Sequence, residues 1–481
     1  MERFYNIVNG RPVDSAEYFH SANPATGEKL GLVPQSTEEE VALAVAAAKA
    51  AQPAWAARTD SERGEFIQRV ADVFQQNSAY LAEWVTREQG KPLGGVGPGQ
   101  VPGSLFEIWA CETWTRATAE IALPVDVVFE DANRRDEVHR KPYGVVAAVA
   151  PWNWPLMIAV WQIIPAIRAG NAVVIKPSEY TSIASLEMLR IIADVLPPGV
   201  INTVSGGGAV GAWLVENRDI AKIMFTGSNA TGSRIAAVAA RNIVPTTMEL
   251  GGNDAAIVLP DADPRAVATG VFWGAFLNMG QTCAAIKRLY VHEALHDAVV
   301  DELKTLVEGA LMGNGMAPGV MMGPVQNRPQ YEKIKALVDD ARARGATIVC
   351  GGNPIEGPGN FYPLTLVTDI EDGAPLVDEE QFGPVLPVLR YRDVEAAIES
   401  ANRIDVGLGA SVWGSDLARA YEVANRIEAG TVWINQHGAV HPMVPFGGVK
   451  RSGWGVEFGV EGLKSITQSR VISIGKPSAE A

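Results

Sequence analysis

The amino-acid sequence predicts an α/β protein with two successive α/β domains. Its 481 residues are enough for two or three domains with large cores. Short runs of strand-forming residues alternate with segments of helical spacing, which is the rhythm of βαβ units and parallel sheets. The first set of predicted strands lies at residues 144–150, 172–176, 200–204, 222–226 and 246–249. The second set lies at residues 255–259, 288–292, 347–350, 385–391, 410–413 and 431–435. The two domains are therefore expected to join near residues 250–252.

The chain before the first set of strands is predicted to be mostly helical. Thr37 and Glu40 have the spacing of a capping box in front of a helix rich in Ala and Val. Apolar side chains between residues 67 and 74 follow the spacing of a second, amphipathic helix. Residues 36–90 are therefore expected to form helices, and the Gly- and Pro-rich residues 94–103 a loop.

Two segments around residue 143 have predictions of their own. Residues 125–129 and 137–140 flank a polar turn, which predicts a hairpin that projects from the parallel sheet. Residues 144–175 are strongly apolar, but Pro, Asn and Arg residues interrupt them. Because no clean run of about 20 apolar residues remains, we expect a buried strand, helix and strand there rather than a membrane span.

Composition and charge exclude several classes of partner. The net charge of −15 repels phosphate backbones, so nucleic acid is not expected to bind. The three cysteines, Cys111, Cys283 and Cys350, are far apart, odd in number and without metal-ligand spacing. They favour a reducing compartment, which we take as the cytoplasm, and they predict neither a disulfide framework nor a metal site. The N-terminus has no apolar segment of the signal-peptide type.

Cys283 and Glu249 are the first candidates for chemistry. Cys283 lies in Met279-Gly-Gln-Thr-Cys283, and a cysteine attacks as a thiolate, which forms more readily at a helix N-terminus or beside a cation. The alternative is a buried, inert cysteine. Glu249 ends an apolar strand just before two glycines, where parallel sheets place their sites, and burial would adjust its pKa for a general base. The alternative is a satisfied or solvent-facing glutamate.

Three further turns follow predicted strands. Asn153 lies in a stiff turn with a Trp and a Pro on each side. Its side-chain amide could stabilise an oxyanion, or it could bond its own backbone. Lys176 and Glu179 could each bond a ribose hydroxyl, or they could belong to a surface turn. Gly227 and Ser228 precede a predicted helix whose N-terminus could bind a pyrophosphate, although the G-x-G-x-x-G pattern is absent.

Taken together and in order, these motifs resemble the aldehyde dehydrogenase superfamily over nearly the whole chain. The matching motifs are Asn23-Pro-Ala-Thr-Gly27, Pro151-Trp-Asn153, Lys176-Pro-Ser-Glu179, Phe225-Thr-Gly-Ser228, Glu249-Leu-Gly-Gly252, Gly280-Gln-Thr-Cys283, Glu380-Gln-Phe-Gly-Pro384 and Pro445-Phe-Gly-Gly448.

The resemblance implies a fold and a set of catalytic residues. The fold is a Rossmann-like NAD-binding domain at residues 1–119 and 143–249, a catalytic α/β domain at 250–435, a β-hairpin oligomerisation arm at 120–142 and 464–474, and a C-terminal segment lining the active site at 436–463. Cys283 matches the nucleophile, Glu249 the general base, and Asn153 the amide of the oxyanion hole. A homodimer or homotetramer is the implied assembly.

The resemblance also implies NAD as the cofactor, with NADP possible. Lys176 and Glu179 match contacts to the adenosine ribose, and Glu380 matches the contact to the nicotinamide ribose. The full set of implied cofactor-binding residues is Trp152, Lys176, Glu179, Gly208, Gly227, Ser228, Glu380 and Phe382.

Two departures from the family pattern and two alternative functions remain. Gln162 stands where the family often has a lysine, which puts a proton path from Glu249 through that lysine in doubt. Val456 stands where the family has an arginine, which removes a structural cation. A coenzyme A-acylating enzyme is one alternative, although such relatives generally lack the glutamate. A non-catalytic protein on the same fold is the other.

The substrate is expected to be an aromatic or medium aliphatic aldehyde. The residues that match the aldehyde tunnel are apolar: Trp154, Trp161 and Phe446, with Val440 beside them. A short semialdehyde would need a cation for its carboxylate, and no arginine stands in these motifs.

Overall fold

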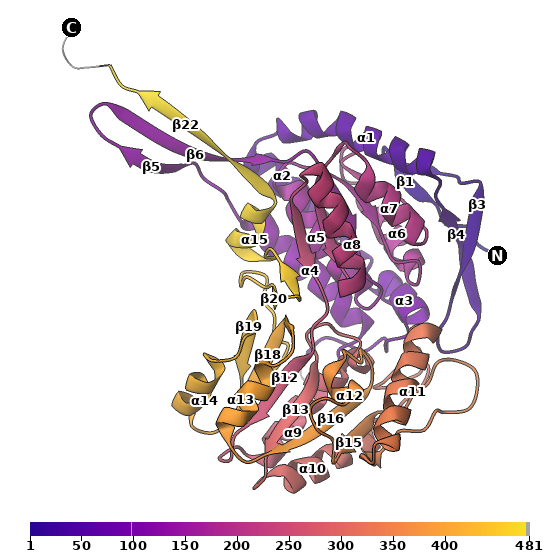
Figure 1. The fold of residues 1–481 in the computed structure, drawn as a ribbon. Helices are drawn as coiled ribbons and strands as arrows, with labels where there is room; N and C mark the ends of the chain where they lie inside the picture. The colour runs from indigo at the N-terminus through magenta and orange to yellow at the C-terminus, as the bar shows by residue number, and fades with distance from the viewer. Residues whose placement is uncertain (98, 478–481) are drawn as a thin grey trace.

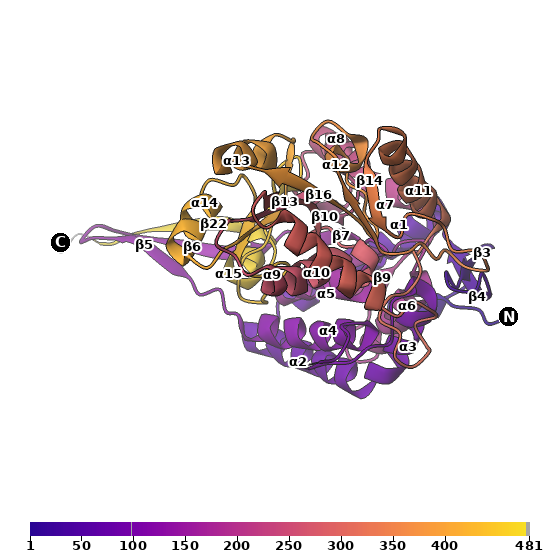
Figure 2. The same ribbon diagram turned by 90° about the horizontal axis from the view of Figure 1, so that it is seen from below.

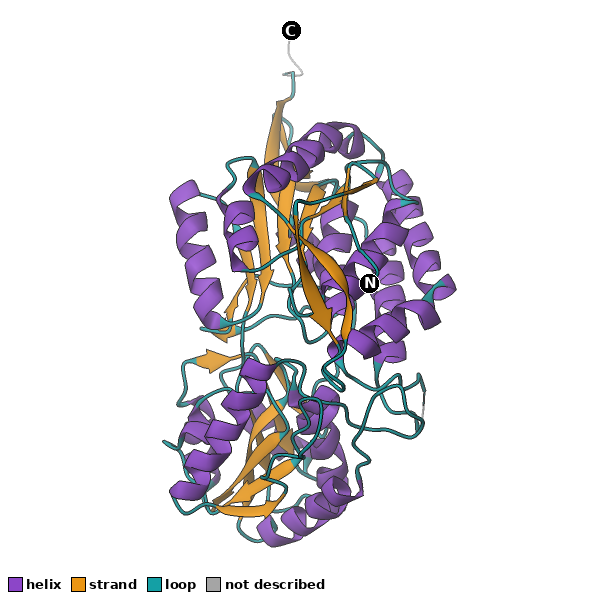
Figure 3. Cartoon of the chain, turned by 90° about the vertical axis from the view of Figure 1, so that its right-hand side faces the viewer, coloured by secondary structure: helices purple, strands orange, loops and turns teal. Residues whose placement is uncertain are grey.

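The structure is a computed structural model that describes residues 1–97 and 99–477. Two α/β units follow one another, each with helices on both faces of a sheet, and a long β-ribbon projects from the first (Figure 1, Figure 2, Figure 3). None of the helices in these residues is long and apolar enough to cross a membrane. The apolar segment 144–175 folds, as predicted, into the strand β7 (Val145–Val149), the helix α5 (Pro155–Arg168) and the strand β8 (Ala172–Lys176).

The first sheet has six strands in the order β21-β11-β10-β7-β8-β9. Its neighbours are parallel, except that β21 runs antiparallel to β11. Each predicted strand of the first set is present, and the short β21 joins them from the C-terminal region. The bounds are β9 (Ile201–Thr203), β10 (Ile220–Thr226), β11 (Thr246–Glu249) and β21 (Gly453–Trp454).

Alternate residues of β7 pack into two different cores. Val145 and Ala147 belong to the core shared with α1, α7 and α8, whereas Val146 and Ala148 belong to the core shared with α2 to α6. A strand buried on both faces is a continuous apolar run, which is how the sequence predicted it. The helices are α1 (Glu38–Ala56), α2 (Asp60–Gln76), α3 (Ser78–Gln89), α4 (Ser104–Glu120), α6 (Ser182–Ala193), α7 (Gly208–Glu216) and α8 (Asn229–Asn242).

The N-terminal region confirms the predicted helices and adds elements that were not predicted. Thr37 and Glu40 form the capping box of α1, and residues 67, 70, 71 and 74 are buried along α2. The described part of 94–103 is a loop, as predicted. The helix α4 and four strands were missed: β1 (Asn6–Val8), β2 (Arg11–Val13), β3 (Glu17–Ala22) and β4 (Lys29–Gln35).

The second sheet has seven strands in the order β14-β15-β16-β13-β12-β18-β19. All its pairs are parallel except β14 with β15. The predicted strands are present, whereas the four-residue β15 was missed. Their bounds are β12 (Asp254–Val258), β13 (Ile286–His292), β14 (Thr347–Cys350), β15 (Thr365–Thr368), β16 (Val385–Tyr391), β18 (Gly409–Trp413) and β19 (Thr431–Ile434). The helices around it are α9 (Pro264–Phe276), η1 (Leu277–Gly280), α10 (His296–Gly309), α11 (Arg328–Ala343), α12 (Pro375–Asp378), α13 (Val394–Asn402) and α14 (Leu417–Ala424).

The projecting ribbon is a three-stranded sheet in the order β22-β6-β5 (Figure 1). The predicted hairpin is β5 (Asp126–Glu130) and β6 (Arg134–Pro142), and the C-terminal strand β22 (Thr467–Gly475) runs antiparallel along β6. The first residues of the expected arm segment 464–474 are helical, since residues 464 and 465 complete the helix α15 (Gly459–Ser465). Near α15, β17 (Val406–Gly407) pairs with β20 (Val449–Lys450).

Candidate active site

The predicted catalytic residues meet at one cavity beside the carboxyl ends of β7 and β11. Glu249 ends β11, Asn153 lies in the turn between β7 and α5, and Cys283 lies in the loop that leads to β13. All three line a cavity of about 180 Å³. Of the predicted cofactor residues, the same cavity contains Trp152, Gly227, Ser228, Glu380 and Phe382. Open α/β sheets place their ligands at this end of the strands.

The backbone before Cys283 has an unusual conformation. Asn278, Met279 and Gly280 all have positive φ angles, of 53°, 60° and 66°. A side chain at Gly280 would collide with the carbonyl oxygen of Gly383, so this position needs a glycine. The tight turn delivers the half-buried Cys283 to the cavity wall.

No helix begins at Cys283, so the expected help from a helix N-terminus is missing. Burial raises the pKa of the thiol to about 12, and the positive charge of Lys287 is the largest opposing influence. The free enzyme therefore holds Cys283 as a neutral thiol at neutral pH, and thiolate formation needs a base or a cation.

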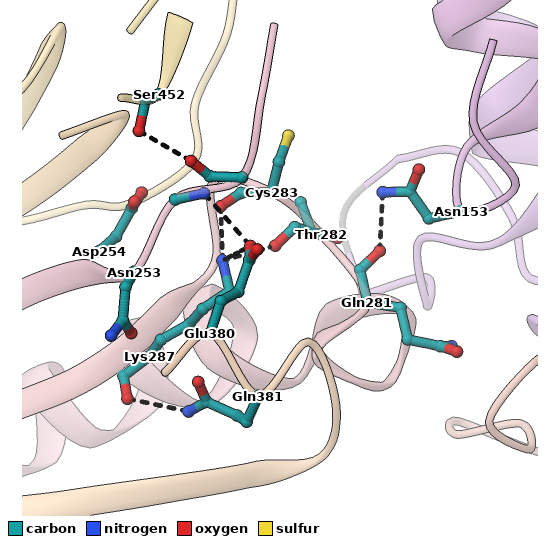
Figure 4. A network of polar contacts seen from close by, with 12 residues as sticks. Asn153, Asn253, Asp254, Gln281, Thr282, Cys283, Lys287, Glu380, Gln381 and Ser452 are labelled. Atoms are coloured by element: carbon teal, nitrogen blue, oxygen red, sulfur yellow. Dashed lines mark hydrogen bonds and ion pairs between the residues drawn. The ribbon is translucent and has the colours of Figure 1, made fainter. Parts of the chain in front are cut away.

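Lys287 is a residue of this site that the sequence analysis missed. Its ammonium group donates to the carbonyl oxygens of Thr282, at 3.0 Å, and Cys283, and it lies 3.2 Å from the Glu380 carboxylate (Figure 4). A lysine four positions after a candidate nucleophile, at the start of a predicted strand, is a signal that could have identified it.

Glu249 is buried with both carboxylate oxygens free of hydrogen bonds to the described residues. Burial raises its pKa well above the usual value, and the nearby Glu457 raises it further. Burial also raises the pKa of Glu457 to about 8. Burial beside a second carboxyl holds the pKa of Glu249 above its usual value, which suits Glu249 to proton transfer rather than to a permanent charge.

Asn153 points its side-chain amide at the cysteine loop rather than at its own backbone. Its Nδ2 donates to the carbonyl oxygen of Gln281 at 2.9 Å (Figure 4). Its main-chain oxygen accepts from Lys91 Nζ at 2.9 Å and from Asn278 Nδ2 at 2.8 Å, which fixes the turn. Because an amide NH₂ has two donors, one of them is not used in the bond to Gln281.

The side chain of Gln162 cannot titrate as the lysine of the family pattern does. Its side chain is buried, and its Nε2 donates to Thr226 Oγ1 at 2.9 Å and to the Val149 carbonyl at 3.3 Å. The amide joins β7 to β10 and supplies no titratable group for a proton path.

A larger groove of about 600 Å³ adjoins the catalytic cavity. The two share Trp152, Gly227 and Ser228 in their linings, and the groove also contains the predicted Gly208, Lys176 and Glu179. Lys176 is buried, lies 3.4 Å from Glu179 Oε2, and has a pKa lowered by burial. Ser228 caps α8 by accepting a hydrogen bond from the Thr231 N–H.

Two of the predicted tunnel residues, Trp161 and Phe446, belong to an aromatic cluster outside the catalytic cavity. Phe458, which the sequence analysis missed, joins Trp161 and Phe446 with ring-centroid distances of 4.7 and 6.0 Å. Trp154 is buried and donates to Thr282 Oγ1 at 3.0 Å, next to Cys283. These side chains and Val440 pack into the same apolar core as Cys283, but they do not line the 180 Å³ cavity.

Comparisons with known proteins agree with this geometry. The model of the aldehyde dehydrogenase family matches residues 12–472. The phenylacetaldehyde dehydrogenase of Pseudomonas fluorescens is 36% identical, with 94% of this chain and 91% of the relative covered. A betaine aldehyde dehydrogenase of Cereibacter sphaeroides is 35% identical over 99% of this chain and 98% of its own.

Solved structures give the same result. The NAD+ complex of an aldehyde dehydrogenase from Bacillus cereus superimposes with a TM-score of 0.94 at 33% identity, covering 98% of this chain and 97% of that one. The predicted α/β fold and activity class are confirmed by these matches. The chain belongs to the aldehyde dehydrogenase family, whose members oxidise aldehydes with a nicotinamide cofactor.

Proposed function

We propose that the enzyme oxidises an aldehyde to the carboxylic acid with NAD+ through an acyl group on Cys283. The observation that carries this proposal is the convergence of Cys283, Glu249 and Asn153 on one cavity that adjoins a long groove. An aldehyde panel followed by NADH absorbance tests it, with the acid measured as product.

The groove fits a dinucleotide. Gly208 begins α7 and Ser228 caps α8, so two helix N-termini border the groove, where N–H groups and the helix dipole favour a pyrophosphate. A side chain at Gly227 would lie 2.6 Å from the Phe225 ring, so the close approach there requires glycine. Lys176 and Glu179 would hold the adenosine ribose, and Glu380 the nicotinamide ribose.

Three side chains of the cavity each have a separate role in the reaction. The Cys283 thiolate adds to the aldehyde carbon, and the second N–H of Asn153 stabilises the resulting thiohemiacetal oxyanion. A nicotinamide held beside Glu380 would supply the acceptor for the hydride, which must leave this carbon because an aldehyde has no other leaving group. Glu249 then removes a proton from a water molecule, which attacks the thioester and releases the acid and the Cys283 thiolate.

Replacing Asn153 with alanine should lower kcat by about 10² to 10³, as expected for the loss of one oxyanion donor. The binding of NAD+ should be nearly unchanged. Steady-state kinetics with a saturating aldehyde measure the effect. Asn171→Ala is the matched control, because it removes a buried amide that donates to the carbonyl oxygens of Ala166 and Ile466, outside the cavity. A decrease of less than threefold for Asn153→Ala would leave stabilisation of the oxyanion to the backbone.

NAD+ should be preferred over NADP+ by about tenfold or more in kcat/KM. Glu179 lines the groove, and as a contact to the adenosine ribose its carboxylate would repel the 2′-phosphate of NADP+. Glu179→Ser should increase the use of NADP+. Glu216→Gln removes another carboxylate of the same groove and should not. Equal kcat/KM values for both cofactors in the unmodified enzyme would contradict the prediction.

Two alternative functions can be separated by assay. A coenzyme A-acylating enzyme would form product only with coenzyme A, and the buried Glu249 argues against it because hydrolysis needs such a base. A non-catalytic protein would not reduce the cofactor with any aldehyde.

The apolar surroundings of Cys283 support an aromatic or medium aliphatic aldehyde. Trp154, Phe446 and Phe458 pack in the same core as Cys283, and among the described relatives one acts on phenylacetaldehyde and one on betaine aldehyde. The panel should therefore include phenylacetaldehyde, hexanal, betaine aldehyde and succinic semialdehyde, with the last expected to be the poorest substrate.

The domain division and the assembly complete the proposal. The NAD-binding domain comprises residues 1–119 and 143–249, the catalytic domain 250–435, and the C-terminal segment 436–463. The ribbon exposes apolar side chains, which supports its role as an arm between subunits of a dimer or tetramer. The three free cysteines support a cytoplasmic location.

A further inference from the structure

Lys287 makes contacts that connect two parts of the site. Its side chain is 2% exposed, and its ammonium group has three N–H donors. Three acceptors surround it: the carbonyl oxygens of Thr282 and Cys283 and the Glu380 carboxylate. The main-chain oxygen of Lys287 also accepts from the Gln381 side chain at 2.9 Å. The ammonium group of Lys287 therefore contacts both the cysteine loop and the Glu380 loop, and its main-chain oxygen contacts the Glu380 loop as well.

The ammonium group forms its hydrogen bonds with the main chain of the nucleophile and not with its sulfur. Figure 4 shows the Cys283 sulfur pointing away from Lys287, while the carbonyl oxygen of the same residue points toward it. Two neighbouring carbonyl dipoles directed at one cation fix the orientation of the peptide that carries the thiol. Removing the cation would take a charged donor from both carbonyl oxygens.

The Glu380 carboxylate is held on the glycines that follow Glu249. Its Oε1 accepts from the Gly252 N–H at 3.2 Å, and a side chain at Gly251 would collide with its Oε2. The carboxylate lines the catalytic cavity, so Lys287 balances a negative charge that faces the space next to Trp152 and Phe382. Burial raises the pKa of Glu380, and Lys287 is the largest opposing influence.

We propose that Lys287 is a positioning residue that sets both the Cys283 loop and the Glu380 carboxylate through one ammonium group. The proposal rests on the roles given above to Cys283 as nucleophile and Glu380 as ribose contact, and adds the residue that couples them. The carboxylates that face Cys283 are Glu380, Asp254 on β12 and Glu249 on β11, and Lys287 on β13 is the cation that opposes them.

The first test is the alkylation of Cys283 by iodoacetamide, followed by peptide mass spectrometry at pH 8. Lys287→Gln keeps N–H donors but loses the charge, so alkylation should slow about tenfold. Glu380→Gln removes the opposing charge and should accelerate it. Lys287→Arg should restore the rate to within about threefold. Cys350, which is half-buried on β14, is the internal reference.

The second test is the pH dependence of the Kd for NAD+, measured between pH 6.5 and 8.5. Without the Lys287 charge the pKa of Glu380 should rise further, so Glu380 should become protonated at a higher pH and lose acceptors for the ribose hydroxyls. As the pH is lowered, the affinity of Lys287→Gln for NAD+ should therefore fall at a higher pH than that of the unmodified enzyme. The double variant Lys287→Gln/Glu380→Gln should lose this difference, because no carboxyl remains at position 380 to titrate, and the four forms together make a mutant cycle.

A matched control separates positioning from a general loss of stability. Lys222 on β10 is 3% exposed and lies outside the cavity and the groove, so Lys222→Met removes a buried ammonium elsewhere. It should change the melting temperature without changing either readout. If Lys287→Gln does not fold, two other variants still test the pairing. Alkylation should be faster in Glu380→Gln, and in Lys287→Arg it should stay near the rate of the unmodified enzyme.

The outcomes distinguish this proposal from the proposed function. If Glu380→Gln weakens NAD+ binding but Lys287→Gln leaves alkylation and the pH profile unchanged, the Lys287 proposal is overturned and the function stands. If Glu380→Gln leaves NAD+ binding unchanged, the ribose contact is misassigned and the coupling fails with it. A slower alkylation together with a pH dependence shifted to higher pH supports the proposal.

Discussion

Cys283→Ala is expected to abolish aldehyde oxidation, with kcat lowered about 10⁴-fold or more. Without the thiol no covalent intermediate forms, and hydride has no path from a bare aldehyde. Cys283→Ser should be nearly as inactive, because a serine hydroxyl at this site has no strong base beside it. NADH absorbance measures turnover, and titration calorimetry should show NAD+ binding within about threefold of the unmodified enzyme.

The chain offers a control cysteine for this experiment. Cys350→Ser removes a half-buried thiol from β14, outside the cavity, and should leave turnover unchanged. Cys111 is less suitable because it is fully buried. A kcat of purified Cys283→Ala within about tenfold of the unmodified enzyme would remove Cys283 from the mechanism, whatever the behaviour of Cys350→Ser.

The two parallel sheets were predictable because their strands are buried on both faces. Such strands appear as short continuous apolar runs, and the helices between them gave the βαβ rhythm. The missed elements lack these signals. The strand β15 is Thr-Leu-Val-Thr, with apolar side chains only at its two central positions. The helix α4 mixes polar and apolar side chains all round, because parts of it pack on α2, α3 and α5. Tertiary packing rather than local pattern decides such segments.

The candidate site was predictable where one residue and its neighbours in sequence carry the signal. Glu249 ends a strand, Asn153 follows one and Cys283 precedes one, and the topology brings the three together. Lys287, Glu457 and Phe458 were missed because their importance comes from contacts across the fold. The influence of Glu457 on Glu249 joins residues that are distant in sequence, and β21 is the element that brings the C-terminal segment to β11.

Glu249→Gln should separate the two half-reactions of the enzyme. Acylation needs the thiolate, the oxyanion donor and the nicotinamide, whereas deacylation needs a deprotonated water, which glutamine cannot supply. A nearly stoichiometric burst of NADH should remain, followed by a steady state at least about 10³-fold slower. Intact mass spectrometry should show the acyl group on Cys283.

The raised pKa of Glu249 adds a pH dependence with a defined sign. A base with a raised pKa is deprotonated only at higher pH, so the steady-state rate of the unmodified enzyme should increase with pH. Glu457→Gln removes the neighbouring carboxyl that contributes to this shift, so it should move the pH profile to lower pH while deacylation persists. The profile of Glu249→Gln should lose this titration.

Glu249 could also help to deprotonate Cys283, since burial keeps the thiol neutral in the free enzyme. In that case the burst of Glu249→Gln would itself be slower, most of all at low pH. Raising the pH should then restore the burst rate but not the steady-state rate, because hydroxide can ionise the thiol without activating a positioned water. A variant that binds NAD+ but shows no burst at any pH and carries no acyl group would assign Glu249 to the thiol, and the hydrolytic role would fall.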